Sequence, residues 1–232
     1  QFYNSLLSIT KEKGGLFKPK PYLVFEISVP EEGEEIGFYM AVPKKSQRAI
    51  QRQIQGFFPE AEINAVNDYN IFSKEGTSAG SILKTKRNYV LPFQTYKKLE
   101  AGTMGIITNA MSLLKERGEG IALQILVKPS GASSKGDAIK VIKNLFAGKS
   151  LDAAIGELES PVSFIDNARK FLSIKEREEI KKPAPAELTP LIKELVEEID
   201  NKAKQNLFEV NIRILASAKT EEEALQILSN TE

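Results

Sequence analysis

Apolar side chains recur at every second position near the start of the chain. They do so over residues 23–29 and again over residues 36–42, and residues 30–33 between them have the turn composition Pro-Glu-Glu-Gly. A period of two is typical of half-buried strands, so the pattern predicts a β-hairpin. A short apolar helix over residues 2–9 and a loop up to residue 20 are expected before it.

The hydrophobic period becomes helical over residues 46–58. Ile50, Ile54 and Phe57 lie three or four positions apart, and Pro59 follows them. This spacing predicts an amphipathic helix that buries one face and ends before the proline.

The segments that follow complete a mixed pattern of helices and strands. We predict strands over residues 61–66, 82–93 and 121–127, a turn-rich connection over residues 67–81 and a helix over residues 103–114. From residue 36 onward the order is strand, helix, strand, strand, helix, strand, with one extra strand in front. This is the split βαβ order, so the predicted fold class is α+β with a ferredoxin-like core.

A helical insertion is expected over residues 132–205. A Gly/Ser-rich loop over residues 129–137 leads into it, and the strongest helix signal is Thr189 as N-cap with Pro190 at the first helical position. The other predicted helices of the insertion cover residues 138–146, 151–157 and 165–181.

Alternation resumes at the end of the chain. It predicts a strand over residues 207–214, and Thr220 with Glu223 forms the sequence signature of a capping box that begins a helix. A strand–helix pair normally returns to its sheet with another strand, and Gln1 is not the usual first residue of a translated chain. We therefore expect a piece of a longer protein.

The final strand–helix pair is similar to residues 37–46, and two interpretations stay open. The similarity is either the one that any strand-to-helix turn shows or the start of a second ferredoxin-like half. On the second interpretation the chain has four parts: an N-terminal helix and loop (1–20), a ferredoxin-like domain (21–131), the helical insertion (132–205) and a truncated second half (206–232).

One pentapeptide is expected in two conformations. Ala-Leu-Gln-Ile-Leu occurs at residues 122–126, within a predicted strand, and again at residues 224–228, within the last predicted helix. The surrounding pattern, and not the five residues themselves, decides between the two.

Composition excludes several kinds of chemistry. The 232 residues include no Cys and no His, so serine and cysteine triads, redox dithiols and most zinc sites lack their usual side chains. We expect no catalytic residue, no cofactor and no metal site. A net charge of +1 excludes a strong overall attraction to nucleic acid, and no apolar run is long enough to span a bilayer.

Two glycine-containing sequences are similar to phosphate-binding loops but lack an essential residue. Before Gly148-Lys149, a Walker A motif needs a glycine at the position that Lys143 occupies, so we predict a helix C-cap there instead. Residues 131–136 have the glycine spacing, but Asp137 replaces the lysine, which predicts a flexible loop.

Two groups of basic residues are candidates for contact with nucleic acid. In the first, Lys45, Arg48 and Arg52 share the polar face of the predicted helix 46–58 and could meet a phosphate backbone. An ordinary solubilising face around a core remains the alternative for this group.

The second group falls in the predicted strand 82–93, where aromatic side chains accompany the cations. Lys84, Lys86 and Arg87 have Tyr89 and Phe93 nearby, and aromatics beside cations on a sheet face can stack bases. The same alternative applies, because the consensus of the common RNA-recognition fold is absent.

Four stretches of the sequence together resemble a known family. They are FYNSLLSI, YLVFEISVP, IGFYMAVPKKSQRAIQRQIQGFFPEAEI with the following Asn-Asp-Tyr, and LFEVNIRILASAKTEEEALQIL. They resemble the region before the motor in type IV secretion and conjugative DNA-transfer ATPases of the HerA/FtsK-like class. Walker A and Walker B elements are absent, so no catalytic residue carries over.

This resemblance implies a non-catalytic N-terminal region that serves assembly or substrate engagement. The implied partners are the protein's own ATPase motor domain and neighbouring secretion-system subunits, with DNA as a further candidate and the membrane reached only through parts outside this chain. The implied location is cytoplasmic, with the cytoplasmic face of the membrane as a candidate site. A free-standing single-stranded nucleic-acid-binding module is the alternative function.

Overall fold

The structure is a computed structural model in which two compact units are distinguished. It describes residues 2–10, 22–30, 35–67, 69–93, 103–112, 114, 118–130, 133–159 and 188–231. We call residues 1–84, 95–129 and 208–232 the sheet unit, and residues 85–94 and 130–207 the helical unit. The predicted loop 11–20, the turn at 31–33 and the helix 165–181 lie outside the described residues.

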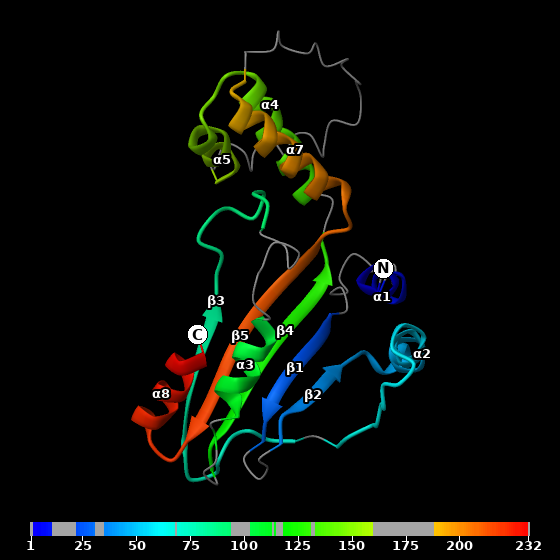
Figure 1. Ribbon diagram of the computed structural model, residues 1–232, viewed down its shortest axis with the longest axis vertical. Coiled ribbons are helices and arrows are strands. Elements are labelled where there is room, and N and C mark those ends of the chain that lie inside the picture. The colour runs from blue at the N-terminus through cyan, green and yellow to red at the C-terminus, as the bar shows by residue number, and fades with distance from the viewer. Residues whose placement is uncertain are drawn as a thin grey trace, which may run out of the picture. The chain divides into compact units, whose positions relative to one another are not determined.

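Within the part of the chain that the structure describes, one five-stranded antiparallel sheet forms the sheet unit (Figure 1). Its strands are β1 (Leu23–Val29), β2 (Gly37–Ala41), β3 (Thr77–Leu83), β4 (Gly120–Pro129) and β5 (Phe208–Ala218). Their order is β2-β1-β4-β5-β3. The predicted pairing of the first two strands is confirmed, and so is the α+β class.

One face of the sheet is apolar because the strand period of two aligns across neighbouring strands. Ile27 of β1 is opposite Leu123 of β4, which is opposite Ile214 of β5, and all three are buried. Helices α3 (Thr103–Met111) and α8 (Glu221–Thr231) pack on this face, where Met111 is fully buried (Figure 1).

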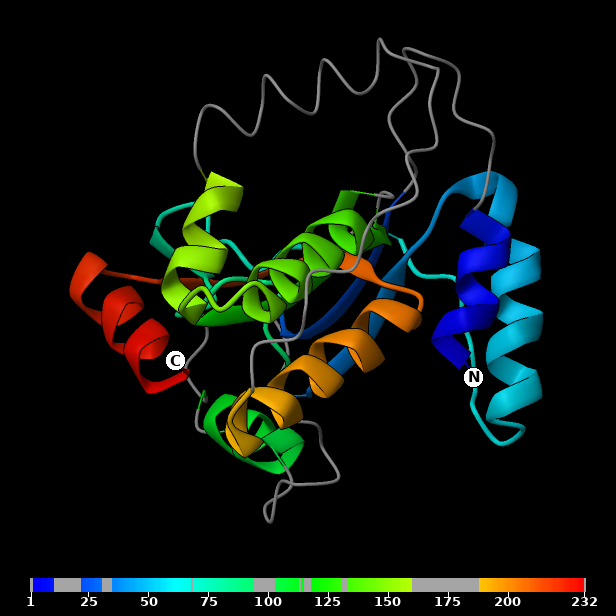
Figure 2. The same cartoon turned by 90° about the horizontal axis from the view of Figure 1, so that it is seen from above.

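A second apolar cluster forms where β1 and β2 meet the first two helices. Leu6 of α1 (Phe2–Thr10) and Ile50 of α2 (Gln47–Phe57) are buried together with Leu23. The two helices lie side by side (Figure 2), and the short helix η1 (Lys44–Ser46) leads into α2. The predicted amphipathic helix is therefore confirmed.

The strand predicted over residues 82–93 is wrong, and so is the one over 61–66, which has no regular structure. The strand β3 begins at Thr77, inside the expected turn-rich connection, and ends at Leu83. Its sequence, TSAGSIL, lacks an apolar alternation because it is an edge strand with mostly exposed side chains. Backbone pairing with β5 holds it instead.

A split βαβ unit is present in the sheet, but its strands are not the ones that the sequence predicts. β5 lies between β3 and β4 and is antiparallel to both, so β3 and β4 run in the same direction and α3 connects them. β5 and α8, which we assigned to a second half, belong to the same compact unit as the other strands.

Among the described residues of the helical unit, three helices pack around a core of their own. They are α4 (Ser133–Phe146), α5 (Leu151–Glu159) and α7 (Pro190–Lys204). Val141, Ala154 and Ile199 are fully buried there. Thr189 caps α7 as predicted, because its hydroxyl accepts a hydrogen bond from the Ile192 amide at 3.4 Å.

The predicted Gly/Ser loop before α4 is shorter than expected. The helix begins at Ser133, whereas the sequence places its start at Ala138. Gly136 lowers helix propensity by about 1 kcal/mol relative to Ala. Burial of Ala138 and Val141 one turn later outweighs this local preference.

We predict that Ile121→Ala will lower the free energy of unfolding by roughly 3 kcal/mol, because it leaves a cavity beneath α3 and α8. Urea unfolding followed by circular dichroism measures the change. Ile106→Ala is the matched control: this side chain of α3 is 64% exposed, so its loss should cost well under 1 kcal/mol. Equal effects of the two substitutions would contradict the assignment of the core.

Candidate functional site

The first predicted basic group lies on an exposed helical surface. Lys45 is in η1, Arg48 and Arg52 are on α2, and all three side chains are exposed. Ile50, on the opposite side of α2, is 2% exposed. The amphipathic pattern therefore presents the cations to solvent, as the sequence predicts.

This surface, which we call the α2 surface, is cationic without neighbouring acids in the chain. Lys44 adds a fourth exposed cation, and no Asp or Glu occurs between Glu35 and Glu60. An anion that approaches α2 thus meets no local negative charge from this stretch of sequence.

Aromatic rings stand at the C-terminal end of the same helix. Phe57 and Phe58 each pack edge-to-face on Phe2, with ring centroids 5.5 and 5.7 Å apart. They nevertheless stay 39% and 54% exposed. Phe57 shares the helix face of Ile50, so the exposed rings lie at the end of the cationic helix and not among its cations. Proteins that bind single-stranded nucleic acids use both cations and exposed aromatic rings.

The second predicted basic group is exposed but is not on a strand. Lys84 follows β3 in the sheet unit, whereas Lys86 and Arg87 belong to the helical unit. Only Lys84 adjoins β3, so the three cations do not share a strand. The prediction of a basic, aromatic strand over residues 82–93 is wrong for this reason.

The aromatic residues of that segment are engaged inside the helical unit. The Tyr89 hydroxyl donates a hydrogen bond to Asp137 Oδ2 at 2.5 Å, and the Phe93 ring lies 4.3 Å from Lys202 Nζ. The Lys202 ammonium also donates to the carbonyl oxygens of Tyr89 and Leu91, at 2.5 and 2.7 Å. Lys202 thereby fixes residues 89–93 against α7.

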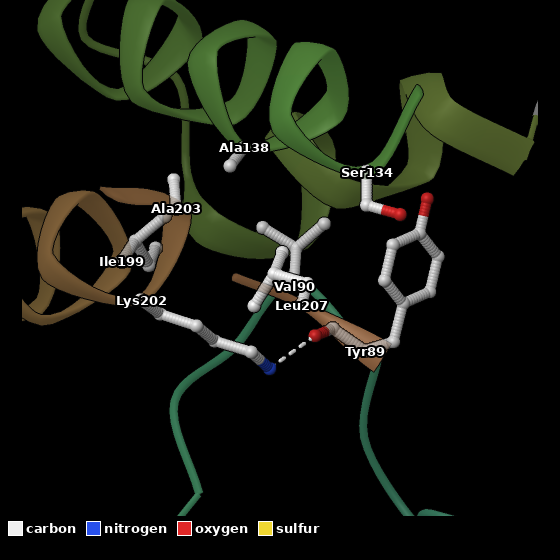
Figure 3. Close-up of a pocket in the computed structure, with 8 residues that line it drawn as sticks. All are labelled: Tyr89, Val90, Ser134, Ala138, Ile199, Lys202, Ala203 and Leu207. Carbon is white, nitrogen blue, oxygen red and sulfur yellow. Dashed lines mark hydrogen bonds between the residues drawn. The ribbon is translucent and has the colours of Figure 1, made fainter. Parts of the chain in front are cut away.

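A small hollow lies beside Lys202 (Figure 3). Tyr89 and Ser134 stand at one side of it and Ile199 at the other, and its volume is about 10 Å³. This is room for one water molecule and not for a substrate. Burial lowers the pKa of Lys202, and partial burial together with the bond to Asp137 raises the pKa of Tyr89.

Gly148 and Lys149 form the C-terminal end of α4 and not a phosphate-binding loop, as predicted. Gly148 has φ +81°, its amide donates to Leu145 O, and the Lys149 amide donates to Asn144 O, at 3.0 and 3.1 Å. These bonds form a Schellman cap of α4.

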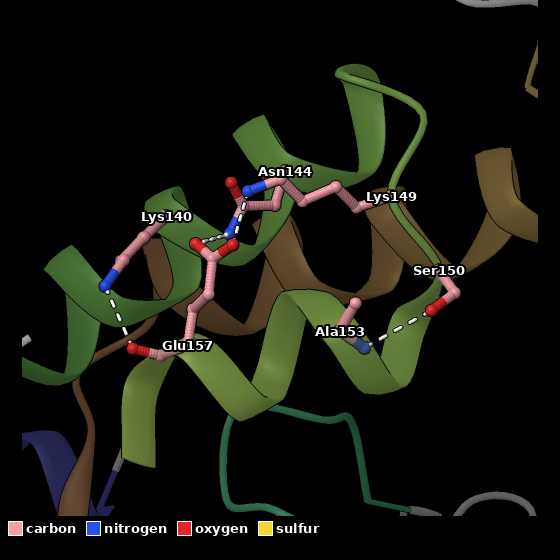
Figure 4. A network of polar contacts seen from close by, with 6 residues as sticks. All are labelled: Lys140, Asn144, Lys149, Ser150, Ala153 and Glu157. Atoms are coloured by element: carbon pink, nitrogen blue, oxygen red, sulfur yellow. Dashed lines mark hydrogen bonds and ion pairs between the residues drawn. The ribbon is translucent and has the colours of Figure 1, made fainter. Parts of the chain in front are cut away.

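Lys149 is engaged by a carboxylate (Figure 4). Its ammonium pairs with Glu157 of α5, which also accepts a hydrogen bond from the Asn144 amide at 2.8 Å. The hydrogen bond from Lys149 is the main cause that lowers the pKa of Glu157. The network joins α4 to α5, so it has a clear structural role.

A row of polar side chains crosses the other face of the sheet. Arg213 Nε donates to Gln124 Oε1 at 2.6 Å, and Gln124 Nε2 donates to Glu26 Oε2 at 2.7 Å. We call Glu26, Gln124 and Arg213 the polar row. The three are direct neighbours on β1, β4 and β5.

Tyr69 closes the polar row at its β1 end. Its hydroxyl donates to Glu26, and its ring stacks on Tyr39 with centroids 4.2 Å apart. Burial and the bond to Glu26 raise the pKa of Tyr69. The sequence shows single polar residues inside apolar strands, but it could not show that these residues meet, because their pairing depends on the register of distant strands.

The segment that carries Tyr69 covers part of this face. Ile71 is 4% exposed, and the Ser73 amide donates to Ser217 Oγ of β5 at 3.1 Å. Gly120 lies under the segment, where a Cβ would collide with the Ile71 carbonyl oxygen. The glycine is therefore required by this close backbone approach.

Other site classes find little support in the described residues. No group of three or more acidic, His or Cys side chains is arranged to hold a metal ion among them. Among the same residues, no helix is long and apolar enough to cross a membrane.

The comparisons with known proteins give one match. The sequence model of a family described as "Domain of unknown function (DUF8128)" matches residues 1–231. Neither the curated proteins nor the solved structures include a match.

We predict that stability will fall as the pH rises above the ordinary tyrosine pKa of about 10. Folding raises the pKa of Tyr69 and Tyr89, so the native state favours the neutral phenols. Their contribution is fully present below pH 10 and is lost as the pH rises through the native values. Urea unfolding at pH 8 to 11 measures the dependence.

Tyr69→Phe should make that dependence shallower, since it removes one of the two phenols. Tyr22→Phe is the control, because this tyrosine is 57% exposed and should leave the dependence unchanged. If Tyr69→Phe leaves the dependence of stability on pH unchanged, the raised pKa of Tyr69 in the native state is contradicted.

Proposed function

We propose that this chain, which belongs to the family of the domain of unknown function DUF8128, is a non-catalytic assembly or substrate-engaging region of a type IV secretion or conjugative transfer ATPase. The resemblance described above points to the ATPase. The observation that carries the engagement role is the α2 surface, with its exposed cations and no acid between Glu35 and Glu60.

The number of cations sets how strongly this surface could hold a nucleic acid. Three phosphate contacts, from Lys45, Arg48 and Arg52, would give a slope of log K against log salt of about −2 for a single strand. Binding by so few contacts is weak at physiological salt, on the order of 10⁻⁵ M. Weak binding by one chain is sufficient in an assembly, because several subunits that bind the same strand raise the overall avidity.

A second function is favoured by Phe57 and Phe58. Exposed rings at the C-terminal end of the cationic helix would stack unpaired bases at about 1–3 kcal/mol each, which would make a free-standing single-strand binder possible. The two functions differ in the affinity of the isolated chain, because only the second requires tight binding without other subunits.

We further propose a cytoplasmic location, with the protein's own motor domain and neighbouring secretion-system subunits as partners. The resemblance supports both statements. A motor would have to be encoded in the same gene, so the complete gene should contain a Walker A motif within a few hundred residues of this region. A complete gene without one would refute the link to a transfer ATPase.

We predict weak, salt-dependent binding of a fluorescent oligothymidylate, measured by anisotropy between 20 and 200 mM salt. Arg48→Glu with Arg52→Glu should weaken it at least tenfold at low salt and flatten the slope. The matched control is Lys135→Glu with Lys193→Glu, which reverses two exposed cations of the helical unit and should have little effect.

The magnitude of binding separates the two functions. A dissociation constant below about 1 µM at 150 mM salt would favour the free-standing binder. Equal losses in the two double variants, or no binding at low salt, would contradict a specific role of the α2 surface.

A further inference from the structure

We propose that the outer edge of β3 accepts one extended strand of a partner polypeptide, which runs antiparallel to β3 and lies beneath α8. This protein-binding edge is independent of the nucleic-acid contact proposed for the α2 surface. It would make the chain a receptor for a short linear segment of another subunit.

The first argument is the state of the edge itself. β3 pairs with β5 on one side, and no strand among the described residues pairs with its other side. Edge strands are usually protected by charges, proline or bulges. The residues Thr77–Leu83 include no charged side chain and no proline, so the strand's own sequence does not protect this edge against backbone pairing.

The second argument is the apolar surface that the edge leaves exposed. Ile82 is 57% exposed and Leu83 is 45% exposed, on opposite faces of the strand. An added strand with apolar side chains would cover part of both. Strand addition of this kind gains affinity from the backbone and specificity from alternate side chains.

The third argument is the position of α8. The helix packs against both β5 and β3, and it extends past β3 at this side of the sheet (Figures 1 and 2). Ala224, Ile227 and Leu228 face the sheet, whereas Leu225 is 51% exposed. A strand added next to β3 would pack under the part of α8 that extends past β3.

The topology sets the direction of the added strand. All four strand pairs of the sheet are antiparallel, and α3 connects β3 to β4 across the intervening β5. A strand beyond β3 that is parallel to β5 would continue this alternation. Its N-terminal end would then lie near the exposed Lys84, which favours an acidic residue at that end.

The same helix argues against a second copy of this chain as the occupant. Antiparallel pairing of two β3 edges would bring both copies of α8 to the same face, above the same junction. Each helix already extends past its own edge (Figure 1), so the two helices would compete for the space above that junction. A lone strand fits where a whole second sheet unit does not.

A donor-strand fusion tests the proposal. A copy of residues 209–218 is joined after Thr231 through a Gly/Ser linker of about ten residues, which can span up to roughly 30 Å. This copy has Glu209 at its N-terminal end and the apolar alternation of β5. The control donor carries prolines at two alternate positions, so it cannot complete the ladder.

Hydrogen exchange and thermal unfolding are the readouts. We expect the outward amides of Thr77–Leu83 to exchange at least tenfold more slowly in the donor fusion than in the proline control, with a higher Tm and a monomeric protein. Ile82→Lys should reduce this protection because it places a charge at the edge. Val210→Lys, at a site of β5 that is 52% exposed against 57% for Ile82, should not.

Three results would overturn the proposal. The first is equal exchange in the donor fusion and the proline control. The second is equal effects of Ile82→Lys and Val210→Lys. The third is dimerisation of the unfused chain with protection of the same amides, since a second copy would then occupy the edge.

Discussion

The pairing of β4 with β5 is the interaction on which the sheet unit depends. Its register runs from Gly120 opposite Ser217 to Pro129 opposite Phe208, and it places Ile121 and Leu123 in the centre of the core. The two strands are neighbours in the sheet, yet residues 130–207 separate them in the chain. Closing so long a connection costs roughly 3 kcal/mol more than closing a two-residue turn. Burial of the apolar face under α3 and α8 has to offset this cost, which makes that face the basis of the unit.

The parts of the fold that the sequence predicts are those with short-range patterns. The hairpin of β1 and β2 and the amphipathic α2 follow from periods of two and of about four residues within single segments. β3 does not follow, because its strand character comes from β5, far away in the chain. The α2 surface was predictable for the same reason as the helix itself. The polar row was not, since Glu26, Gln124 and Arg213 become neighbours only through the register of three strands.

The repeated pentapeptide shows how context decides. At residues 122–126 it forms part of β4, where Ala122 and Leu123 are buried on opposite faces of the sheet. At residues 224–228 it forms part of α8, where Ala224, Ile227 and Leu228 are buried on one side of the helix. The same five side chains therefore satisfy a period of two in one place and a helical period in the other. The capping box of Thr220 and Glu223 fixes the helical choice, with both of its hydrogen bonds present.

The polar row also has a consequence for evolution of the sheet. A shift of one residue in β1, β4 or β5 would turn Glu26, Gln124 or Arg213 toward the apolar face and leave its partners unsatisfied. Single-residue insertions in these three strands should therefore be excluded by selection. β3 carries no charged side chain and takes no part in the polar row, so its register is not fixed in this way. The three strands β1, β4 and β5 thus tolerate no change of length, whereas the edge strand β3 can accept insertions and substitutions more easily.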